Sequence, residues 1–275
     1  MRKITNHFKR LRKSAGFTIT EVMIASIIAS FAIAAGMELL INQNESHLTQ
    51  AGVSDMQQNG RAVVDELVGK LRQTGYKLRT GTQCLFARNS NPDTLSVVFM
   101  AEPLCTATVS SSMSLPSSTV RCAGAALSCL QENSWAYIYD VVKDSGEFFY
   151  VTGVSTGTGD IQHSLANLSK AYPQGAKLMV LDFYKYYVNA SDSLHPKLMM
   201  VRNGGEPEIY AENISDLQFK YVMANGTMFD TIVVDRYVRQ VNISVVTRTE
   251  KRDMFVDGYR YDTLSSSAMI RNFSM

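Results

Sequence analysis

The feature that most constrains the fold is a long apolar run near the N-terminus. Phe17 to Met37 reads FTITEVMIASIIASFAIAAGM, 21 residues in which Glu21 is the single charged side chain. As an α-helix this run spans roughly 31 Å, about one hydrocarbon thickness of a lipid bilayer. The run therefore predicts a helix that spans a membrane.

The charges around this run predict its orientation. Six of the 27 basic residues precede Gly16, with no acid among them: Arg2, Lys3, Lys9, Arg10, Arg12 and Lys13. Because basic residues stay on the cytoplasmic side, the N-terminus is expected in the cytoplasm and everything after Met37 outside. The formal net charge of +2 gives no reason to expect nucleic-acid binding, and no nucleic-acid partner is predicted.

All cysteines lie in the part expected outside, in an oxidising space where disulfides persist. They are Cys84, Cys105, Cys122 and Cys129. None forms a CxxC motif and no His stands at a metal-ligand spacing from them, so they are disulfide candidates and no metal site is predicted. Three connectivities are possible. Pairing of Cys84 with Cys105 and of Cys122 with Cys129 is favoured because both loops are short, but sequence alone leaves the choice open.

Glu21 is an anomaly inside the apolar run. An unpaired carboxylate at such a depth costs about 2.5–3.5 kcal/mol on insertion scales. One interpretation places Glu21 close enough to the cytoplasmic interface to reach water. The other follows from the sequence GFTITE, residues 16–21, behind a short basic leader, which resembles the type III signal of the type IV pilin superfamily.

That resemblance implies a chemistry for each of these residues. A membrane-embedded aspartyl prepilin peptidase would cut between Gly16 and Phe17, so that residues 1–16 are a leader peptide. Phe17 would become the N-methylated first residue, and Glu21 the acidic residue used in assembly. Glycine suits the cut because a side chain there would obstruct a protease cleft that holds extended backbone.

The physics of assembly can be argued from the same residues. Cleavage creates a positive amine on Phe17 beside Glu21 in a low-dielectric setting, where each charge needs a partner. Glu21 of one subunit pairing with the Phe17 amine of another would set the axial register of a filament, since mismatched registers leave a charge unpaired.

A second cut is also possible. Ala32-Ile33-Ala34 forms an A-x-A motif after an apolar stretch, as signal peptidase recognises, and cleavage after Ala34 would release a soluble secreted protein. Glu21 within the stretch and the helical pattern that continues past Ala34 count against it.

The helix is expected to continue well beyond the membrane. Residues 38–79 form its amphipathic second half, with an apolar stripe at spacings near three and four: Met37, Leu40, Ile41, Leu48, Ala51, Met56, Val63, Leu67 and Leu71. No proline interrupts residues 17–91, and Gly75 is a suitable stop, which predicts one helix of about 58 residues. Gly52, Gly60 and Gly69 predict close approach of this helix to a sheet or another helix.

Residues 80–275 are expected to form a β-rich head. Strands are predicted, from alternating apolar and aromatic positions, at Thr94–Met100, Trp135–Val142, Glu147–Val154, Leu178–Val188, Lys197–Val201, Leu217–Met223, Val238–Val246 and Tyr259–Ile270. Asn203-Gly204-Gly205 predicts a hairpin turn. Residues 106–131, rich in Ser, Ala and Cys, are expected to form an inserted, disulfide-stapled loop and not core.

The expected fold class is therefore α+β, with a long N-terminal helix, membrane-spanning in its first half, packed through its second half on an antiparallel β-sheet head. No HExxH, GxSxG, Walker A or paired CxxC motif occurs. No catalytic residue and no cofactor are predicted, and the chain is not expected to be an enzyme.

Later motifs are similar to those of PilW-type minor pilins. They are Gln58–Arg61, Leu71-Arg72, Gly75-Tyr76, Asn203–Pro207, Ile214–Tyr221, Val241–Val245 and Met269–Asn272. Lys70 departs from the family, which usually carries an acid two residues before the arginine matched by Arg72; this departure puts any salt bridge at that position in doubt.

This resemblance implies a pilin-like fold and a minor pilin at or near the tip of a type IV pilus, where it primes assembly. The implied partners are prepilin peptidase, other minor and major pilins, the inner-membrane assembly platform and, before assembly, membrane lipid. The chain would first cross the bacterial inner membrane once and then reach the extracellular pilus. The alternatives are a large minor pseudopilin of a type II secretion system and the soluble secreted binding protein cut after Ala34.

Overall fold

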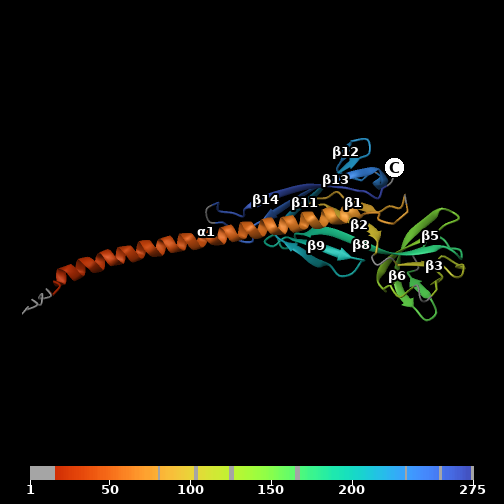
Figure 1. Ribbon diagram of the computed structural model, residues 1–275, viewed down its shortest axis with the longest axis horizontal. Coiled ribbons are helices and arrows are strands. Elements are labelled where there is room, and N and C mark those ends of the chain that lie inside the picture. Colours follow the sequence, from red (N-terminus) through yellow and green to blue (C-terminus); the bar gives the residue numbers. More distant parts are fainter. Residues whose placement is uncertain are drawn as a thin grey trace, which may run out of the picture. The chain divides into compact units, whose positions relative to one another are not determined.

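The computed structural model describes residues 16–79, 81–101, 105–123, 127–164, 168–232, 234–253 and 256–273 (Figure 1). In chain order the elements are α1 (Ile19–Gln73), β1 (Leu85–Arg88), β2 (Thr94–Met100), β3 (Thr106–Thr108), β4 (Val120–Arg121), β5 (Ser134–Asp140), β6 (Ser145–Ser155), β7 (Asp160–His163), β8 (Lys177–Asn189), β9 (Lys197–Arg202), β10 (Glu208–Glu212), β11 (Ile214–Met223), β12 (Met228–Phe229), the 3₁₀ helix η2 (Asp235–Tyr237), β13 (Val238–Arg248) and β14 (Tyr261–Met269). Of the expected leader, residues 1–15 lie outside the described residues.

One long helix followed by antiparallel sheets confirms the expected α+β, pilin-like architecture. The helix α1 has 55 residues and ends just before Gly75, whose φ of +74° is a conformation that glycine adopts without strain. The chain divides into two compact units, residues 1–51 and 52–275, so α1 contributes to both.

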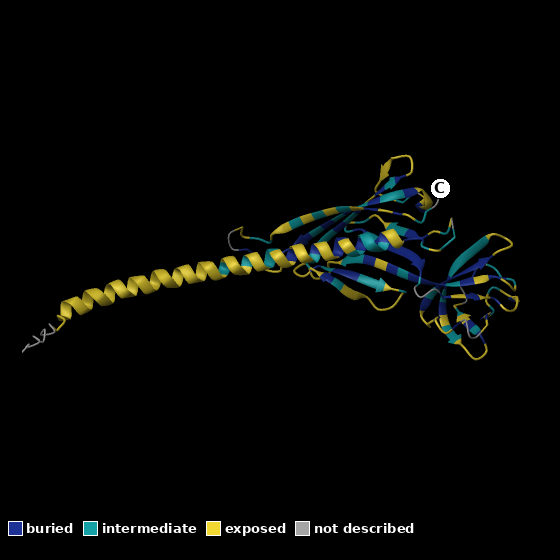
Figure 2. Cartoon of the chain, in the orientation of Figure 1, coloured by how far each residue is buried: buried dark blue, intermediate teal, exposed yellow. Residues whose placement is uncertain are grey.

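The first unit consists, in its described part, of Gly16, Phe17 and Thr18 followed by the first half of α1. Every residue from Gly16 to Asn44 is exposed (Figure 2). The hydroxyl groups of its serines are satisfied within the helix, because Ser26 donates to the Met23 carbonyl at 2.8 Å and Ser30 to the Ser26 carbonyl at 2.8 Å. Hydrogen bonds of this kind let polar side chains remain in an apolar surrounding.

The second unit contains two antiparallel sheets. The larger has the strand order β1-β2-β8-β5-β6-β7-β4, and β3 and the β9–β10 hairpin also pair along β8. The smaller has the order β12-β11-β13-β14. The Asn203-Gly204-Gly205 turn joins β9 to β10, as predicted, with φ of 53° at Asn203 and 77° at Gly204.

The second half of α1 is the central element of the main hydrophobic core. Val63, Leu67 and Leu71 are fully buried, in one cluster with residues of both sheets. The larger sheet contributes Leu95, Tyr186 and Leu198 among others, and the smaller contributes Leu217, Ile243 and Val245. The amphipathic stripe is therefore confirmed as core from Met56 onward, whereas its members from Met37 to Ala51 are exposed.

Of the three helix glycines predicted to approach a sheet closely, only Gly60 does so. A Cβ atom at Gly60 would lie 2.6 Å from Leu264 Cδ1 and 2.9 Å from Thr247 Cγ2, so β13 and β14 touch the helix there. The same atom at Gly52 would make ordinary contact with Thr249, at 4.0 Å. At Gly69 it would meet nothing within 4 Å, so the expectation is wrong for that residue.

The expectation that residues 106–131 stay outside the core is wrong. Val109, Met113, Val120, Leu127 and Leu130 are all buried. They belong to a second hydrophobic cluster, together with the inner faces of β5, β6 and β8.

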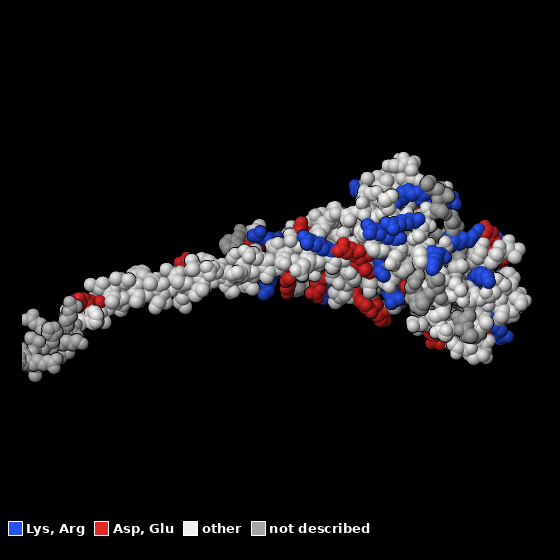
Figure 3. All heavy atoms as spheres, in the orientation of Figure 1, with Lys and Arg blue, Asp and Glu red and all other residues white. Residues whose placement is uncertain are grey.

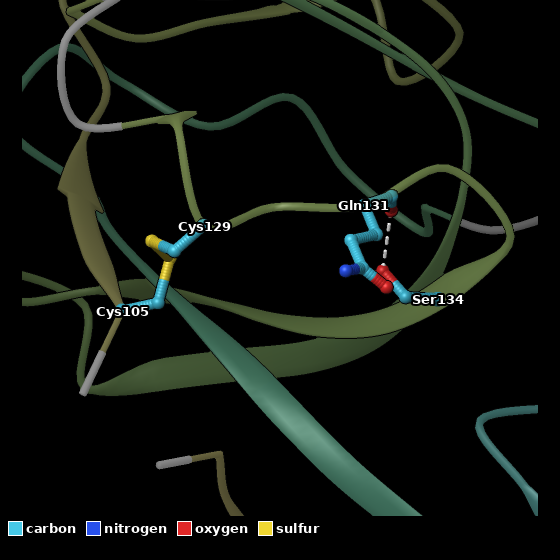
Figure 4. The surroundings of a disulfide bond; sticks show 4 residues. All are labelled: Cys105, Cys129, Gln131 and Ser134. Carbon is cyan, nitrogen blue, oxygen red and sulfur yellow. Dashed lines mark hydrogen bonds between the residues drawn. A yellow bond between two sulfur atoms is a disulfide. The ribbon is translucent and has the colours of Figure 1, made fainter. Parts of the chain in front are cut away.

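The favoured disulfide pairing is also wrong. Cys105 is bonded to Cys129, with their Cα atoms 5.9 Å apart (Figure 4). Cys84 and Cys122 are buried free thiols. Strand pairing decides this outcome, not loop length. Val98 of β2 donates to the Cys84 carbonyl, whereas Val180 of β8 donates to the Cys105 carbonyl, so the backbones of these two cysteines lie beside different strands.

We expect the two glycines to respond oppositely to alanine. Gly60→Ala lowers stability by about 1–3 kcal/mol, because the core must move to admit the methyl group. Gly69→Ala raises it by up to about 1 kcal/mol, because alanine is the better helix former and nothing obstructs it. The thermal melting of the full-length protein in detergent micelles measures both. Equal effects of the two substitutions would contradict the close approach at Gly60.

Peptide mapping without reduction is expected to yield one disulfide-linked pair, Cys105 with Cys129. Burial raises the pKa of Cys84 to about 12 and that of Cys122 to about 11, so neither thiol reacts with alkylating agents at pH 8 until the protein unfolds. Cys105→Ser should cost about 3 kcal/mol through the lost chain constraint, measured by urea unfolding. A linked Cys84 or Cys122 peptide would contradict this pairing.

Candidate functional site

The start of α1 is built around Thr18 and Glu21. The Thr18 N–H donates to Glu21 Oε2 at 2.9 Å, and the Glu21 N–H donates to Thr18 Oγ1 at 3.3 Å. These reciprocal bonds form a capping box, in which Thr18 is the N-cap and Glu21 the third helical residue. The Thr18 hydroxyl also donates to Glu21 Oε2 at 2.9 Å. Glu21 therefore stabilises the first turn of its own helix.

Gly16 and Phe17 precede this turn and are open to solvent. Neither is helical, and the Phe17 side chain is 87% exposed. A Cβ atom at Gly16 would have nothing within 4 Å, so no packing within the described chain requires glycine at this position. The bond between Gly16 and Phe17 is thus exposed and lies outside the helix.

The helix that follows carries an uncovered apolar surface. Its exposed large side chains are Ile19, Val22, Met23, Ile24, Ile27, Ile28, Phe31, Ile33 and Met37. The helix is long and apolar enough to cross a membrane, and its most apolar window is not buried by any described residue. In the space-filling view this surface is white apart from scattered acidic side chains (Figure 3).

The charges of this segment have one sign. After Gly16 the first Lys or Arg is Arg61, whereas Glu21, Glu38, Glu45 and Asp55 precede it. If the chain is cut before Phe17, the new amine becomes the first full positive charge of the product. In the uncut chain, the Glu21 carboxylate accepts its hydrogen bonds from Thr18 and not from Phe17.

The other end of α1 gathers several motifs that are distant in the sequence. Asn272 donates through Nδ2 to the carbonyls of Arg72, Gln73 and Thr74 at 3.1–3.4 Å, and so caps the helix C-terminus. A Cβ at Gly75 would lie 3.1 Å from the Phe273 ring. Nearer the middle of the helix, Asn59 Nδ2 lies 3.5 Å from the Glu212 carbonyl. The motifs around Gly60, Gly75 and Asn272 therefore serve to attach the helix to the sheets.

Lys70 finds partners other than the acid of the resembled family. Its Nζ lies 3.7 Å from the centroid of the Tyr184 ring and 3.9 Å from Glu66 Oε1. Glu66 in turn accepts a hydrogen bond from the Tyr186 hydroxyl at 2.6 Å. Burial, followed by this bond and the Glu66 charge, raises the pKa of Tyr186 well above its usual value.

Sequence reasoning missed two of these contacts. The T-x-x-E spacing of Thr18 and Glu21 is the signal that would have found the capping box. Glu66 stands between the buried positions Val63 and Leu67, and a carboxylate beside an apolar stripe is a sign of a polar partner in the core. Tyr184 and Tyr186 stack with their ring centroids 6.3 Å apart and are buried, not exposed as a binding platform.

A cavity of about 510 Å³ opens beside the end of α1. Its lining includes Lys70, Arg72, Tyr76, Phe99 and Arg271. Among the described residues, no group of three or more His, Cys, Asp and Glu side chains is placed to hold a metal ion.

Comparison of the chain with protein-family models, with curated proteins and with solved structures finds no match.

Removing the N-cap hydroxyl is expected to fray the first turn of α1. Thr18→Val deletes the acceptor of the Glu21 N–H and should cost about 0.5–2 kcal/mol of local stability. Amide hydrogen exchange at Glu21 and Val22, in the full-length protein in micelles, measures this as faster exchange, with Thr18→Ser as the control that keeps the cap. Unchanged exchange in Thr18→Val would show that the capping box does not hold the turn.

Proposed function

We propose that this chain is a minor pilin of a type IV pilus, first held in the bacterial inner membrane and then incorporated at or near the pilus tip, where it primes assembly. The observation that carries the proposal is the uncovered apolar helix whose first turn holds one carboxylate, Glu21, directly after an accessible Gly16–Phe17 bond. Prepilin peptidase would cut this bond on the cytoplasmic side and methylate the amine of Phe17.

The surroundings of Gly16 support cleavage there. Nothing in the described chain would contact a side chain at this position, so the need for glycine is assigned to the peptidase cleft. The competing cut after Ala34 has no such support. The helix α1 runs without interruption through Ala32, Ile33 and Ala34, whereas a protease holds its substrate as extended backbone.

Glu21 has capacity for a second partner after the cut. Both hydrogen bonds from Thr18 end on Oε2. A carboxylate offers two oxygens and about four acceptor positions, so Oε1 can accept from an amine of another subunit while Oε2 keeps the cap. Because no Lys or Arg lies between Gly16 and Arg61, the Phe17 amine of a neighbouring subunit is the positive charge that can reach this depth.

The rest of the apolar segment suits a bundle of helices. Ala25 and Ala29, and Ala32 and Gly36, are spaced four residues apart on an exposed helix surface. Small residues at this spacing let helix backbones approach closely in a bilayer or in a filament core. Membrane lipid would cover the segment before assembly, and the helices of other minor and major pilins would cover it afterwards.

The head supports a minor role at the tip. Residues 52–275 form one unit with two sheets, and the larger sheet carries an additional hydrophobic cluster that does not involve α1. Such a head is awkward to pack at every step of a thin fibre, but it has room at the end of one. The inner-membrane assembly platform would act on the membrane-held form.

Gly16→Leu is expected to block processing. Intact mass and N-terminal peptide mass spectrometry on protein from membrane and sheared-filament fractions should show wild type beginning at methylated Phe17 and Gly16→Leu retaining its leader. A Gly16→Ala variant, which adds only one methyl group, tests the steric argument through partial processing. A wild-type chain that begins at Ala35 would refute the proposal.

Two substitutions of Glu21 distinguish the role of its negative charge from its role in capping the helix. Glu21→Ala and Glu21→Gln should both be cut at Phe17 and remain in the membrane. Both should be lost from sheared filaments, because neither leaves a carboxylate for the Phe17 amine, although glutamine can still cap Thr18. Quantitative immunoblotting of filaments measures incorporation. Normal incorporation of Glu21→Gln would assign Glu21 to helix capping alone.

A further inference from the structure

Strand β14 is a long edge strand of the smaller sheet. Its nine residues, Tyr261–Met269, pair with β13 only, among the residues that the structure describes. Exposed positions recur along its whole length (Figure 2). The edge facing away from β13 is therefore a row of backbone groups without a strand beside it.

The register identifies which residues face this edge. Just outside the paired strands, Thr249 donates to the Arg260 carbonyl at 2.9 Å and Ile270 donates to the Arg239 carbonyl at 2.9 Å. Hydrogen-bonded pairs alternate with non-bonded pairs in an antiparallel ladder, so the even-numbered residues of β14 bond to β13. The backbone N–H and C=O groups that point outward belong to Tyr261, Thr263, Ser265, Ser267 and Met269.

The other strand edges are short or protected, and β14 is neither. The edge strand β10 has a register shift, begins after Pro207 and carries Glu208 and Glu212. The strands β1, β4 and β12 have four residues or fewer. In contrast, β14 has no proline, lysine, arginine or bulge, and its one charge, Asp262, belongs to the even-numbered set. Within Tyr261–Met269, proline, lysine and a bulge, which commonly prevent strand addition, are therefore absent.

The direction of β14 limits what can pair with it. Gly60 approaches Leu264 and Gly75 approaches Asn272 and Phe273, so β14 runs in the same direction as the second half of α1. Two copies paired through antiparallel β14 strands would direct these helix segments in opposite directions. Subunits of one filament share a polarity, which argues against a second copy of this chain.

We propose that the β14 edge receives an antiparallel strand from a different pilin subunit, so that the smaller sheet continues across the subunit boundary. This rests on the proposed function. The five outward residues are all uncharged, and the occupant is therefore a strand with uncharged side chains opposite them, because a charge there would meet no counter-charge. Main-chain hydrogen bonds to the edge would provide affinity, and the match between uncharged side chains on the two strands would provide selectivity.

Two substitutions at Ser265 test the edge without breaking the sheet. The Ser265 N–H points away from β13, so Ser265→Pro removes an edge donor and no ladder bond. Ser265→Lys places a charge at the centre of the edge. Ser265→Thr keeps the N–H and the neutral side chain, and Ser191→Lys adds the same charge to an exposed loop outside the edge. The last two variants are the matched controls.

The test is carried out in cells with the full-length chain. We expect both disruptive variants to be cut at Phe17 and to melt like wild type in micelles, but to fall about tenfold in sheared filaments, as expected when a backbone hydrogen bond is lost or a charge is left unpaired. Both controls should incorporate normally. If Ser265→Pro proves unstable, Ser265→Lys decides the result.

The outcomes separate this inference from the proposed function. Normal incorporation of Ser265→Lys would overturn the edge proposal and leave the minor-pilin proposal intact. Wild type that is absent from filaments would overturn both. A wild-type dimer in sedimentation of the purified full-length protein, lost in Ser265→Lys, would replace the proposed occupant with a second copy and so overturn it. A monomer supports a different subunit as the occupant.

Discussion

The rest of the structure depends on one helix that meets two different surroundings. From Met56 to Leu71 a stripe of α1 is buried among residues of both sheets, and these contacts unite the two sheets in one core. From Ile19 to Ile41 the same helix carries apolar side chains that no described residue covers. Each fully buried large apolar side chain is worth about 1.5–3 kcal/mol, so the exposed stretch strongly favours any apolar surrounding, whether lipid or other helices.

A second feature is that one part of the larger sheet has a hydrophobic core of its own. Its core consists of β-strand and loop residues and contains no side chain from α1. The Cys105–Cys129 bond closes the loop that covers this core, and it constrains a segment whose side chains are mostly small. Stability therefore comes from two sources, helix burial near α1 and covalent closure farther away, which lets this part of the sheet vary without altering how the helix is held.

The sequence predicts the helix, its end near Gly75 and eight of the strands because each rests on a local pattern, either hydrophobic periodicity or turn chemistry. It fails where strand pairing decides the outcome. The carbonyls of Cys84 and Cys105 bond to different strands, β2 and β8, and no spacing rule in the sequence contains that information. The strands β1, β4, β7 and β12 are too short to show a period. The sequence around Thr18 indicates a helix cap, and a carboxylate at Glu66 beside an apolar stripe indicates a buried polar contact. The partner of Glu66 is given only by the three-dimensional structure.

At the N-terminus, the stability of the helix and the proposed assembly place compatible demands on the same carboxylate. A glutamate at the third helical position stabilises the turn by capping and also by lying near the positive end of the helix dipole. The capping bonds hold the carboxylate of Glu21 in one direction, with Oε2 on Thr18 and Oε1 on the other side. An ion pair in a low-dielectric setting is favourable only when its geometry is good and the remaining acceptors are satisfied. Under the proposed function, the capping box would supply that geometry in advance, so that a subunit would enter the filament with the carboxylate of Glu21 already oriented.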